Sequence, residues 1–265
     1  MLLSQSTQKK INSIKEQKNF KEANPFPHII IDNFFEEKFA DKLSKSFPDY
    51  ESTFLDNYSN AIEEKKLVNH WNKFTPTCYE ALHLLCSDSF VKKINKFVPE
   101  SKNLRADYGL HGGGIHMHKK GGKLNIHLDY SIHPKLNLQR KLNILIYLTK
   151  NWQENWGGVL GLYSNESSEK PGNLIKQIIP IFNRAIIFDV TDNSWHGLPH
   201  EIKCPNGITR NSLAVYYLQE IDSKADPNRL KARFYASPWQ KNDTTIQELI
   251  NKRSNLNTSS DVYQK

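Results

Sequence analysis

Between residues 105 and 220 the sequence is a series of short apolar runs separated by turn-forming residues. The runs are rich in Ile, Leu, Tyr and Phe, and Gly, Asn, Pro and Asp lie between them. They cover residues 123–130, 142–149, 159–163, 178–182, 184–190 and 212–219. Many short strands joined by turns are typical of an antiparallel sandwich or jelly roll, and not of a doubly wound parallel sheet. This pattern therefore predicts a core that is mainly β.

Helical patterns flank this core, so the predicted class is mainly β with flanking helices (α+β). A short strand is expected at His28–Ile31, and apolar residues at helical spacing predict helices near residues 35–47 and 78–97. A short helix is expected at Thr245–Arg253. The predicted organisation is a polar leader (1–23), one domain (24–220) made of a helical part (24–104) and a jelly-roll core (105–220), and a charged C-terminal extension (221–265).

The composition excludes several classes of protein. Cys78, Cys86 and Cys204 form no CxxC pair, which argues against a disulfide framework and a cysteine-rich zinc site. The apolar runs are too short to span a bilayer, and the first residues do not resemble a secretory signal, so we expect a cytoplasmic protein without a membrane partner. The net charge is +8, but the lysines are dispersed, which indicates a solvated surface and no specific nucleic-acid partner.

The segment GGKLNIHLDYS contains His127-Leu128-Asp129. Residues two apart on a strand point to the same face, so the imidazole and the carboxylate would enter one cavity together. An HxD pair alone is weak evidence, because so short a motif also arises by chance. A surface ion pair is the alternative for this motif taken alone.

Two features later in the sequence favour a metal site as the interpretation of the HxD pair. His196, in SWHG, follows the apolar run RAIIFDV, and two histidines with one carboxylate suit non-haem iron(II). Arg210 stands at the start of the apolar run LAVYYL, where a buried guanidinium needs an anion such as a carboxylate. Ser212 would lie on the same strand face and add a hydroxyl donor. The order HxD, His, RxS is more specific than any one of these motifs.

Residues 109–218 resemble the prolyl-hydroxylase-like branch of the iron(II)- and 2-oxoglutarate-dependent oxygenases. The resemblance rests on GGKLNIHLD, RKLNILIYLTKNW, NWGGVLGLY, IFNRAIIFDV, SWHG and RNSLAVYY, and PFPHIIIDNFF is similar to the opening of many such enzymes. It implies a cupin-like, double-stranded β-helix in which His127, Asp129 and His196 bind the catalytic Fe(II). It also implies that Arg210 and Tyr147 bind the distal carboxylate of 2-oxoglutarate.

The implied function is a dioxygenase that hydroxylates a C–H bond with O2 and releases succinate and CO2. The substrate would be a small molecule or a proline-containing peptide, with ascorbate as an optional reductant. The sequence departs from the family where Met117 replaces a tyrosine near the cosubstrate, and in the long connection SIHPKLNLQR.

Three other interpretations are weighed against this one. A cupin-like module that binds metal or carbohydrate without turnover would not need Arg210 together with Tyr147. A nucleic-acid-binding protein would need a basic stripe on one face, which dispersed lysines do not form. The histidines of HGGGIHMH could bind zinc or copper, but no carboxylate or cysteine cluster accompanies them, so we expect a turn leading into the next strand.

Overall fold

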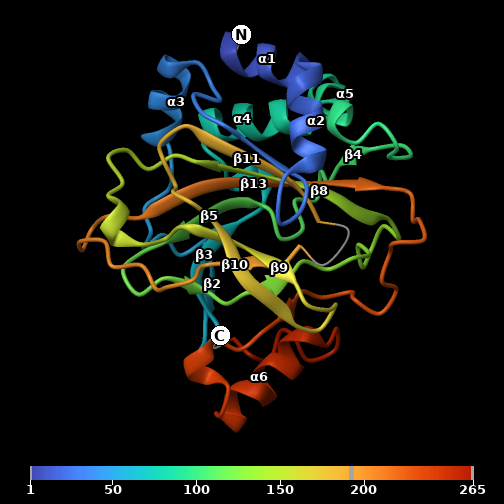
Figure 1. Ribbon diagram of the computed structural model, residues 1–265. Coiled ribbons are helices and arrows are strands. Elements are labelled where there is room, and N and C mark those ends of the chain that lie inside the picture. Colours follow the sequence, from blue (N-terminus) through green and yellow to red (C-terminus); the bar gives the residue numbers. More distant parts are fainter. Residues whose placement is uncertain (1, 191–193, 264–265) are drawn as a thin grey trace.

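The computed structural model of the chain describes residues 2–190 and 194–263. Two antiparallel sheets form the core of a double-stranded β-helix, as predicted (Figure 1). The larger sheet contains, in spatial order, β1 (His28–Ile31), β11 (Arg184–Asp189), β8 (Gln139–Tyr147), β13 (Arg210–Gln219), β5 (Gly114–His118), β3 (Glu63–Val68) and β2 (Asp56–Ser59), with β4 (Arg105–Ala106) beside β13 and β6 (Lys123–Leu124) beside β3. The smaller sheet contains β10 (Pro171–Ile178), β9 (Leu160–Asn165), β12 (His196–Gly197), β7 (His127–Leu128) and β14 (Arg233–Phe234).

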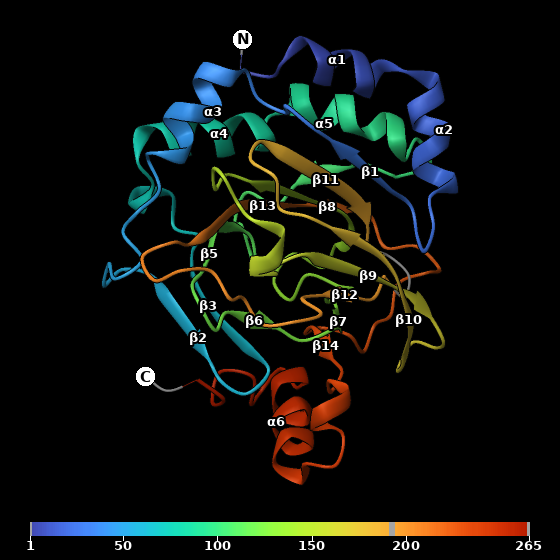
Figure 2. The same ribbon diagram turned by 60° about the vertical axis from the view of Figure 1, so that its left-hand side comes forward.

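Helices cover one side of the larger sheet and one end of the molecule (Figures 1 and 2). Those on the sheet side are α1 (Gln5–Asn12), α2 (Ile14–Glu22), α3 (Glu37–Ser44), α4 (Pro76–Cys86) and α5 (Asp88–Ile94). At the opposite end lies α6 (Thr244–Ser254), which confirms the predicted terminal helix. Short 3-10 turns are η1 (Trp71–Lys73), η2 (Asn95–Phe97), η3 (Glu154–Trp156) and η4 (Pro238–Gln240).

The central strands of the larger sheet are buried on both faces. On β8, Leu142, Ile144 and Ile146 pack into the main core under the helices, whereas Leu145 and Tyr147 face the smaller sheet. Successive side chains on a strand point to opposite faces, so one face of β8 and β13 can be purely apolar while the other carries polar groups. The polar face is the one that meets the smaller sheet.

Three sequence-based elements differ from the structure. The strand expected over residues 178–182 is not formed, because β10 ends at Ile178. The helix expected over residues 78–97 is interrupted at Ser87, whose backbone is extended and whose hydroxyl accepts a hydrogen bond from the amide of Phe90. Ser87 thus ends α4 and caps α5, because a serine at this position satisfies a free amide of the next helix. The strand expected over 123–130 is reduced to the two-residue strands β6 and β7.

The leader segment is folded against the core. Ser4 and Ser13 cap α1 and α2, and Ile11 and Phe20 are fully buried. Phe20 packs on Phe97, with ring centroids 5.1 Å apart. The division of the chain at residues 23 and 220 stays a prediction.

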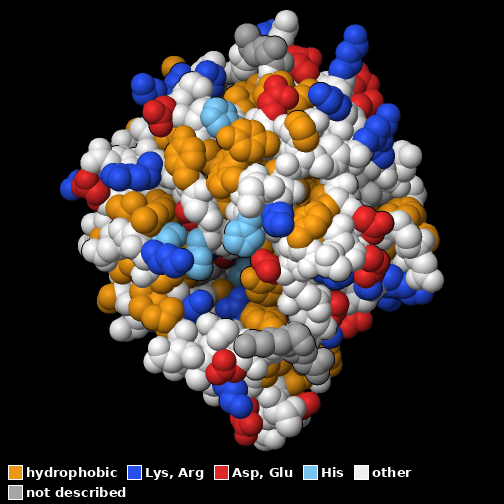
Figure 3. Space-filling model, turned by 180° about the vertical axis from the view of Figure 1, so that it is seen from behind, with side chains coloured by type: hydrophobic (Ala, Val, Ile, Leu, Met, Phe, Trp, Pro, Cys, Tyr) orange, Lys and Arg blue, Asp and Glu red, His pale blue; other side chains and the backbone are white. Residues whose placement is uncertain are grey.

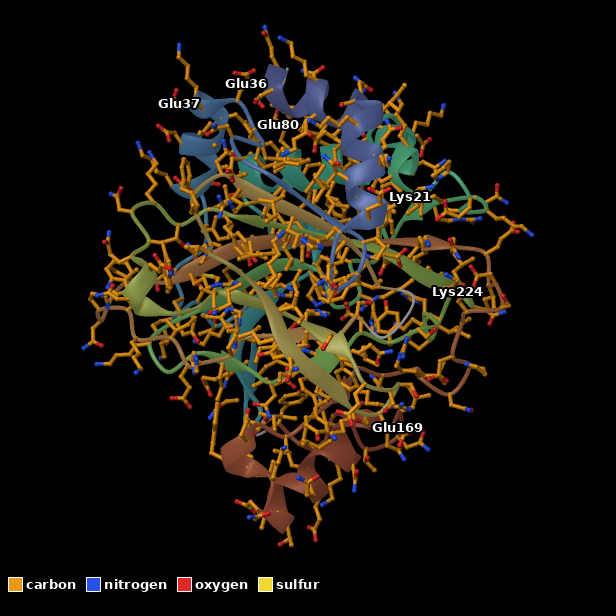
Figure 4. The ribbon with its side chains drawn as sticks, viewed as in Figure 1. Lys21, Glu36, Glu37, Glu80, Glu169 and Lys224 are labelled. Atoms are coloured by element: carbon orange, nitrogen blue, oxygen red, sulfur yellow. The ribbon has the colours of Figure 1, made fainter. Side chains whose placement is uncertain are left out.

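The outer surface carries the dispersed charge that the composition suggested. The side chains labelled in Figure 4, among them Glu37, Lys21 and Glu169, lie at the periphery of the molecule. Lys21 lies 3.7 Å from Glu100, and both of these side chains are exposed. In the described ranges, every helix is too short or too polar to cross a bilayer.

Candidate metal centre and cosubstrate pocket

The two histidines and the aspartate predicted as metal ligands meet at one point in the smaller sheet. His127 on β7 and His196 on β12 are direct partners across the antiparallel pair, with ring centroids 4.4 Å apart. Asp129 follows β7, and its carboxylate oxygens lie 4.0 Å from His127 Nε2 and 3.8 Å from His196 Nε2. One ligand atom from each residue falls within 4.8 Å of the others, and all three side chains are buried. The three side chains are therefore close enough to bind one ion together.

The hydrogen bonds around this triad leave one ligand atom of each residue available. His127 Nδ1 lies 2.9 Å from the carbonyl of Asn125, and His196 Nδ1 lies 2.8 Å from the carbonyl of Ser194. A carbonyl can only accept, so each Nδ1 carries the proton and each Nε2 presents its lone pair. Asp129 Oδ2 is buried without a hydrogen-bond partner. Two imidazole nitrogens and one carboxylate oxygen fit a ferrous ion.

The protonation states also suit a metal. Burial and the neighbouring His196 lower the pKa of His127 to about 3, so its ring is neutral at physiological pH. Burial alone would raise the pKa of Asp129, but Arg140 and the two histidines outweigh it and lower that pKa. His127 thus presents a neutral imidazole and Asp129 an ionised carboxylate, the forms that bind metals.

Arg210, Ser212 and Tyr147 come together on the larger sheet. Arg210 and Ser212 lie two residues apart on β13, and Ser212 is the direct cross-strand partner of Tyr147 on β8. The guanidinium carbon of Arg210 lies 4.8 Å from the centre of the Tyr147 ring, and its Nε donates to the carbonyl of Gly158 at 2.7 Å. The predicted cosubstrate residues therefore share one face of the sheet.

This group contains a buried cation without an anion. Arg210 is 4% exposed, and within the described residues it forms no ion pair with an acidic side chain. Burial lowers the pKa of Arg210. In the described residues the buried Tyr147 hydroxyl has no acceptor for its hydrogen, because the neighbouring Arg210 guanidinium can only donate. Such groups are costly when unpaired, so both indicate that an anionic ligand belongs here.

Arg140 is a second buried arginine, and the motif analysis did not single it out. Its Nη1 lies 3.2 Å from Asp129 Oδ1, and its guanidinium carbon lies 3.2 and 3.3 Å from the ring centres of Tyr130 and Tyr216. The Tyr216 hydroxyl donates to the same oxygen at 3.0 Å. One oxygen of Asp129 is thus held by the protein and the other is left for the metal.

A β-bulge explains why strand alternation does not predict Arg140. Leu142 pairs with Tyr217 but Arg140 pairs with Leu218, so Lys141 is an extra residue in β8. Without it, Arg140 would share the helix-facing side of β8 with Leu142 and Ile144. The extra residue shifts the alternation by one and turns Arg140 toward Asp129. Tyr216 needed no such correction, because it continues the alternation from Arg210 and Ser212.

The HGGGIHMH segment forms β5 and the turn before it. Met117 packs in the main core at 1% exposure, so its replacement of a tyrosine does not alter the cavity wall. His116 and His118 point the other way and line the cavity. In the described residues, His127, Asp129 and His196 are the one group close enough to form a metal site, and the histidines of β5 are not part of it.

The triad, Arg210 and Ser212 line one cavity of about 700 Å³, within the usual range for small-molecule sites. In Figure 3, histidine side chains surround a hollow near the middle of the face, with Lys and Arg side chains below them. The cavity wall also includes Arg253, Ser259, Ser260 and Tyr263, all from the C-terminal extension. Periodicity could not reveal these residues, because they reach the site from far along the chain.

The family description "2OG-Fe(II) oxygenase superfamily" matches residues 113–218, the segment that contains the triad, Tyr147 and Arg210. This part of the chain is similar to that superfamily, and it includes the metal and cosubstrate residues described above. Its expected cofactors are Fe(II) and O2, with 2-oxoglutarate as cosubstrate, and the geometry described above fits them.

Curated relatives match a short part of the chain. Prolyl 3-hydroxylase OGFOD1 of Mus musculus is 32% identical over 57 residues, which is 22% of this chain and 10% of that protein. The same enzyme of Xenopus laevis is 32% identical over 78 residues, 29% of this chain and 15% of that protein. The chain therefore spans only a small fraction of the relatives it matches.

Solved structures resemble the whole domain. A prolyl hydroxylase from Trichoplax adhaerens, in complex with a peptide fragment of a hypoxia inducible factor, gives a TM-score of 0.57 at 19% identity, covering 81% of this chain and 91% of that one. A Pseudomonas putida prolyl-4-hydroxylase gives 0.54 at 14% identity, covering 78% and 97%. At these identities the likeness establishes a common fold.

Proposed function

We propose that this protein is an Fe(II)- and 2-oxoglutarate-dependent dioxygenase that hydroxylates a C–H bond. The observation that carries the proposal is that one cavity contains both a three-residue metal site and a buried arginine with no acidic partner among residues 2–190 and 194–263. Either feature alone occurs in proteins of other function. Together they fit a metal ion that binds a chelating cosubstrate, with the arginine holding the other end of that cosubstrate.

We assign roles to the site residues on this basis. His127, Asp129 and His196 would hold Fe(II). Arg210 and Tyr147 would bind the distal carboxylate of 2-oxoglutarate, with Ser212 as an additional donor. Bound Fe(II) and 2-oxoglutarate supply the oxidising chemistry, in which O2 is consumed, succinate and CO2 are released and one oxygen atom enters a C–H bond.

The protein's own part is to orient the reactants and to exclude water. The Arg210 fork fixes the far end of the cosubstrate and hence the direction of its metal-binding end. Phe188 packs edge-on against His196 at 5.0 Å, and Phe234 stacks on His127 at 5.1 Å. These rings hold the imidazoles in place and keep water from their apolar edges.

A proline-containing peptide or a related small molecule is the proposed substrate. The support is that several relatives and structural neighbours are described as prolyl hydroxylases, including one bound to a peptide. A cytoplasmic location and a stimulating effect of ascorbate stay predictions from the sequence.

The test is succinate release from 2-oxoglutarate in the presence of Fe(II), O2 and candidate substrates, peptidyl and free proline first. Substrate-dependent succinate, with a mass gain of one oxygen atom on the substrate, is the expected result. A protein that binds Fe(II) but never consumes 2-oxoglutarate would contradict the proposal, and would favour a cupin-like binding module.

A further inference from the structure

The mouth of the cavity is built by segments outside the family match. The hairpin of β2 and β3 contributes Asp56, Tyr58 and Lys65, and the C-terminal extension contributes Lys231 and Arg253. Figure 2 shows α6 below the smaller sheet, near the lower ends of β2 and β3. The mouth can therefore carry a specificity of its own, separate from the chemistry below it.

Two cations of the mouth share one buried carboxylate. Glu63 is fully buried, and it pairs with Arg253 at 2.8 Å and with Lys65 at 3.4 Å. The Tyr263 hydroxyl donates a short hydrogen bond to the same side chain. Burial opposes ionisation of Glu63, but Lys65 and Arg253 outweigh it and lower its pKa to about 2. One permanent negative charge thus faces two positive ones.

Lys231 adds a third cation without an acid of its own. It is half-buried, and over the described ranges it forms no ion pair. Burial and the charge of Arg253 both lower the pKa of Lys231. Two positive charges are therefore held near each other where little water reaches them. Asp56 is the other acidic residue of the mouth, and it lies exposed on β2. Three cations against Glu63 and Asp56 leave the mouth with one excess positive charge.

The inner half of the cavity does not cancel this excess. Arg140 is matched by Asp129, and Arg210 together with Fe(II) would face the two negative charges of 2-oxoglutarate. With metal and cosubstrate bound, both the mouth and the inner half of the cavity would still carry a net positive charge. The field of the site therefore favours an anionic substrate.

The mouth is also close to the metal ligands. The guanidinium carbon of Arg253 lies 5.2 Å from the centre of the Phe234 ring, and that ring stacks on His127. An anion bound by Lys231 in the positive field of Arg253 would thus lie near the Phe234 ring, which contacts the triad. The hydroxyls of Ser259 and Ser260, which line the same wall, can donate to it.

We infer that the substrate carries an anionic group, a carboxylate or a phosphate, and that Lys231 binds it at the mouth, beside the positive charge of Arg253, while the neighbouring carbon enters the site. This inference rests on the proposed function and narrows its substrate class to molecules with a negative charge beside the hydroxylated position. A proline flanked by an acidic or phosphorylated residue meets this description.

The test uses capped peptides that differ only in the residue beside one proline: Glu, phosphoserine, Gln or Lys. Their binding to the anaerobic full chain, loaded with Fe(II) and 2-oxoglutarate, is measured by calorimetry at fixed ionic strength. We expect the Glu and phosphoserine peptides to bind about tenfold more tightly than the Lys peptide, and their ratio to identify the preferred anion. Lys231→Glu should abolish or reverse this preference, and Lys231→Gln should weaken it.

Lys252→Glu is the matched control, because Lys252 is exposed on α6, next to Arg253, and does not line the cavity. It should keep the preference of the unmodified chain. Equal binding of acidic and basic peptides, binding of none of them, or an equal effect of Lys252→Glu and Lys231→Glu would overturn the inference. Failure of the proposed function is recognised separately, since an enzyme of another kind would show no Fe(II)-dependent consumption of 2-oxoglutarate with any peptide.

Discussion

The cavity contains two buried arginines, and they differ in where their anion comes from. Arg140 is 2% exposed and Arg210 is 4% exposed, so both guanidinium groups are almost completely removed from water. Arg140 pairs with Asp129 and lies between two tyrosine rings. Arg210 contacts a tyrosine ring and a carbonyl, and in the described part of the chain it forms no ion pair with an acidic residue.

The difference separates a positioning group from a binding group. A buried charge whose partner is built into the protein is already satisfied, and its effect is to hold that partner in place. A buried charge without a partner is satisfied only when a ligand arrives. On this reasoning Arg140 orients a metal ligand, whereas Arg210 is itself a ligand-binding residue.

Removal of a metal ligand should have the largest effect. It tests whether the triad, to which Arg140 is attached through Asp129, binds the metal at all. His127→Ala or Asp129→Ala should abolish Fe(II) binding and, with it, the visible absorption band of the anaerobic complex with 2-oxoglutarate. Asp129→Ala should also destabilise the fold by about 3 kcal/mol, because it leaves Arg140 buried without its anion. Metal analysis and thermal unfolding measure the two effects.

His200→Ala is a suitable control for these variants, because His200 is exposed and outside the triad. It should bind Fe(II) like the unmodified chain. Persistence of the absorption band in both ligand variants would refute the assignment of the triad.

Removal of Arg210 should have the next largest effect. Arg210→Ala should raise the concentration of 2-oxoglutarate needed for half-maximal binding about 100-fold, because a charged two-point contact is lost in a buried site. The affinity for Fe(II) should change about twofold or less. The 2-oxoglutarate affinity of Arg210→Lys should lie between those of the unmodified chain and Arg210→Ala, because an ammonium group keeps the charge but loses the planar fork. Unchanged 2-oxoglutarate affinity in Arg210→Ala would remove the anchor from the mechanism.

Removal of Arg140 should weaken the binding of Fe(II) more than the binding of 2-oxoglutarate, the opposite of the effect expected for Arg210→Ala. Arg140→Met keeps the bulk between Tyr130 and Tyr216 but frees Asp129 Oδ1. We expect Fe(II) affinity to fall about tenfold, as for other groups that orient a metal ligand. At saturating Fe(II), the affinity for 2-oxoglutarate should change far less than in Arg210→Ala. If Arg140→Met weakens 2-oxoglutarate binding as much as Arg210→Ala does, the two arginines do not have separate roles.

The smallest effect is expected for Tyr147→Phe. It removes one hydroxyl whose hydrogen has no acceptor among the described residues, and it keeps the ring that lies against Arg210. Loss of one hydrogen bond to a charged ligand should weaken 2-oxoglutarate binding about tenfold or less. A titration that shows no change would assign the anchor to Arg210 without the tyrosine.

The parts predictable from sequence are those set by local pattern. Strand alternation places Asp129 with His127, and Ser212 with Arg210, because each pair depends on spacing within one segment. The contact between His127 and His196 is not local, and its prediction required the resemblance of the whole segment to a family. The cavity face of the larger sheet was predictable only in part, since the bulge at Lys141 changes the alternation of β8.

The mouth was not predictable for a different reason. Residues 231–263 carry no periodic pattern that points to the triad, and the pairing of Glu63 with Arg253 joins residues 190 positions apart. Only the folded chain brings them together. The helix break at Ser87 was predictable in principle, because a serine between two helical stretches is a recognisable helix cap. The prediction of one continuous helix considered only the spacing of the apolar residues.

The attachment through Glu63 has a consequence for how such enzymes diversify. The C-terminal extension reaches the cavity from outside the family segment, and one buried carboxylate on β3 pairs with its Arg253 and Tyr263. Replacement of Lys231 and of residues 244–263, with the pairing to Glu63 retained, would change the substrate selectivity of the enzyme. The oxidising centre would stay the same, and new substrates could be acquired by changes that never touch it.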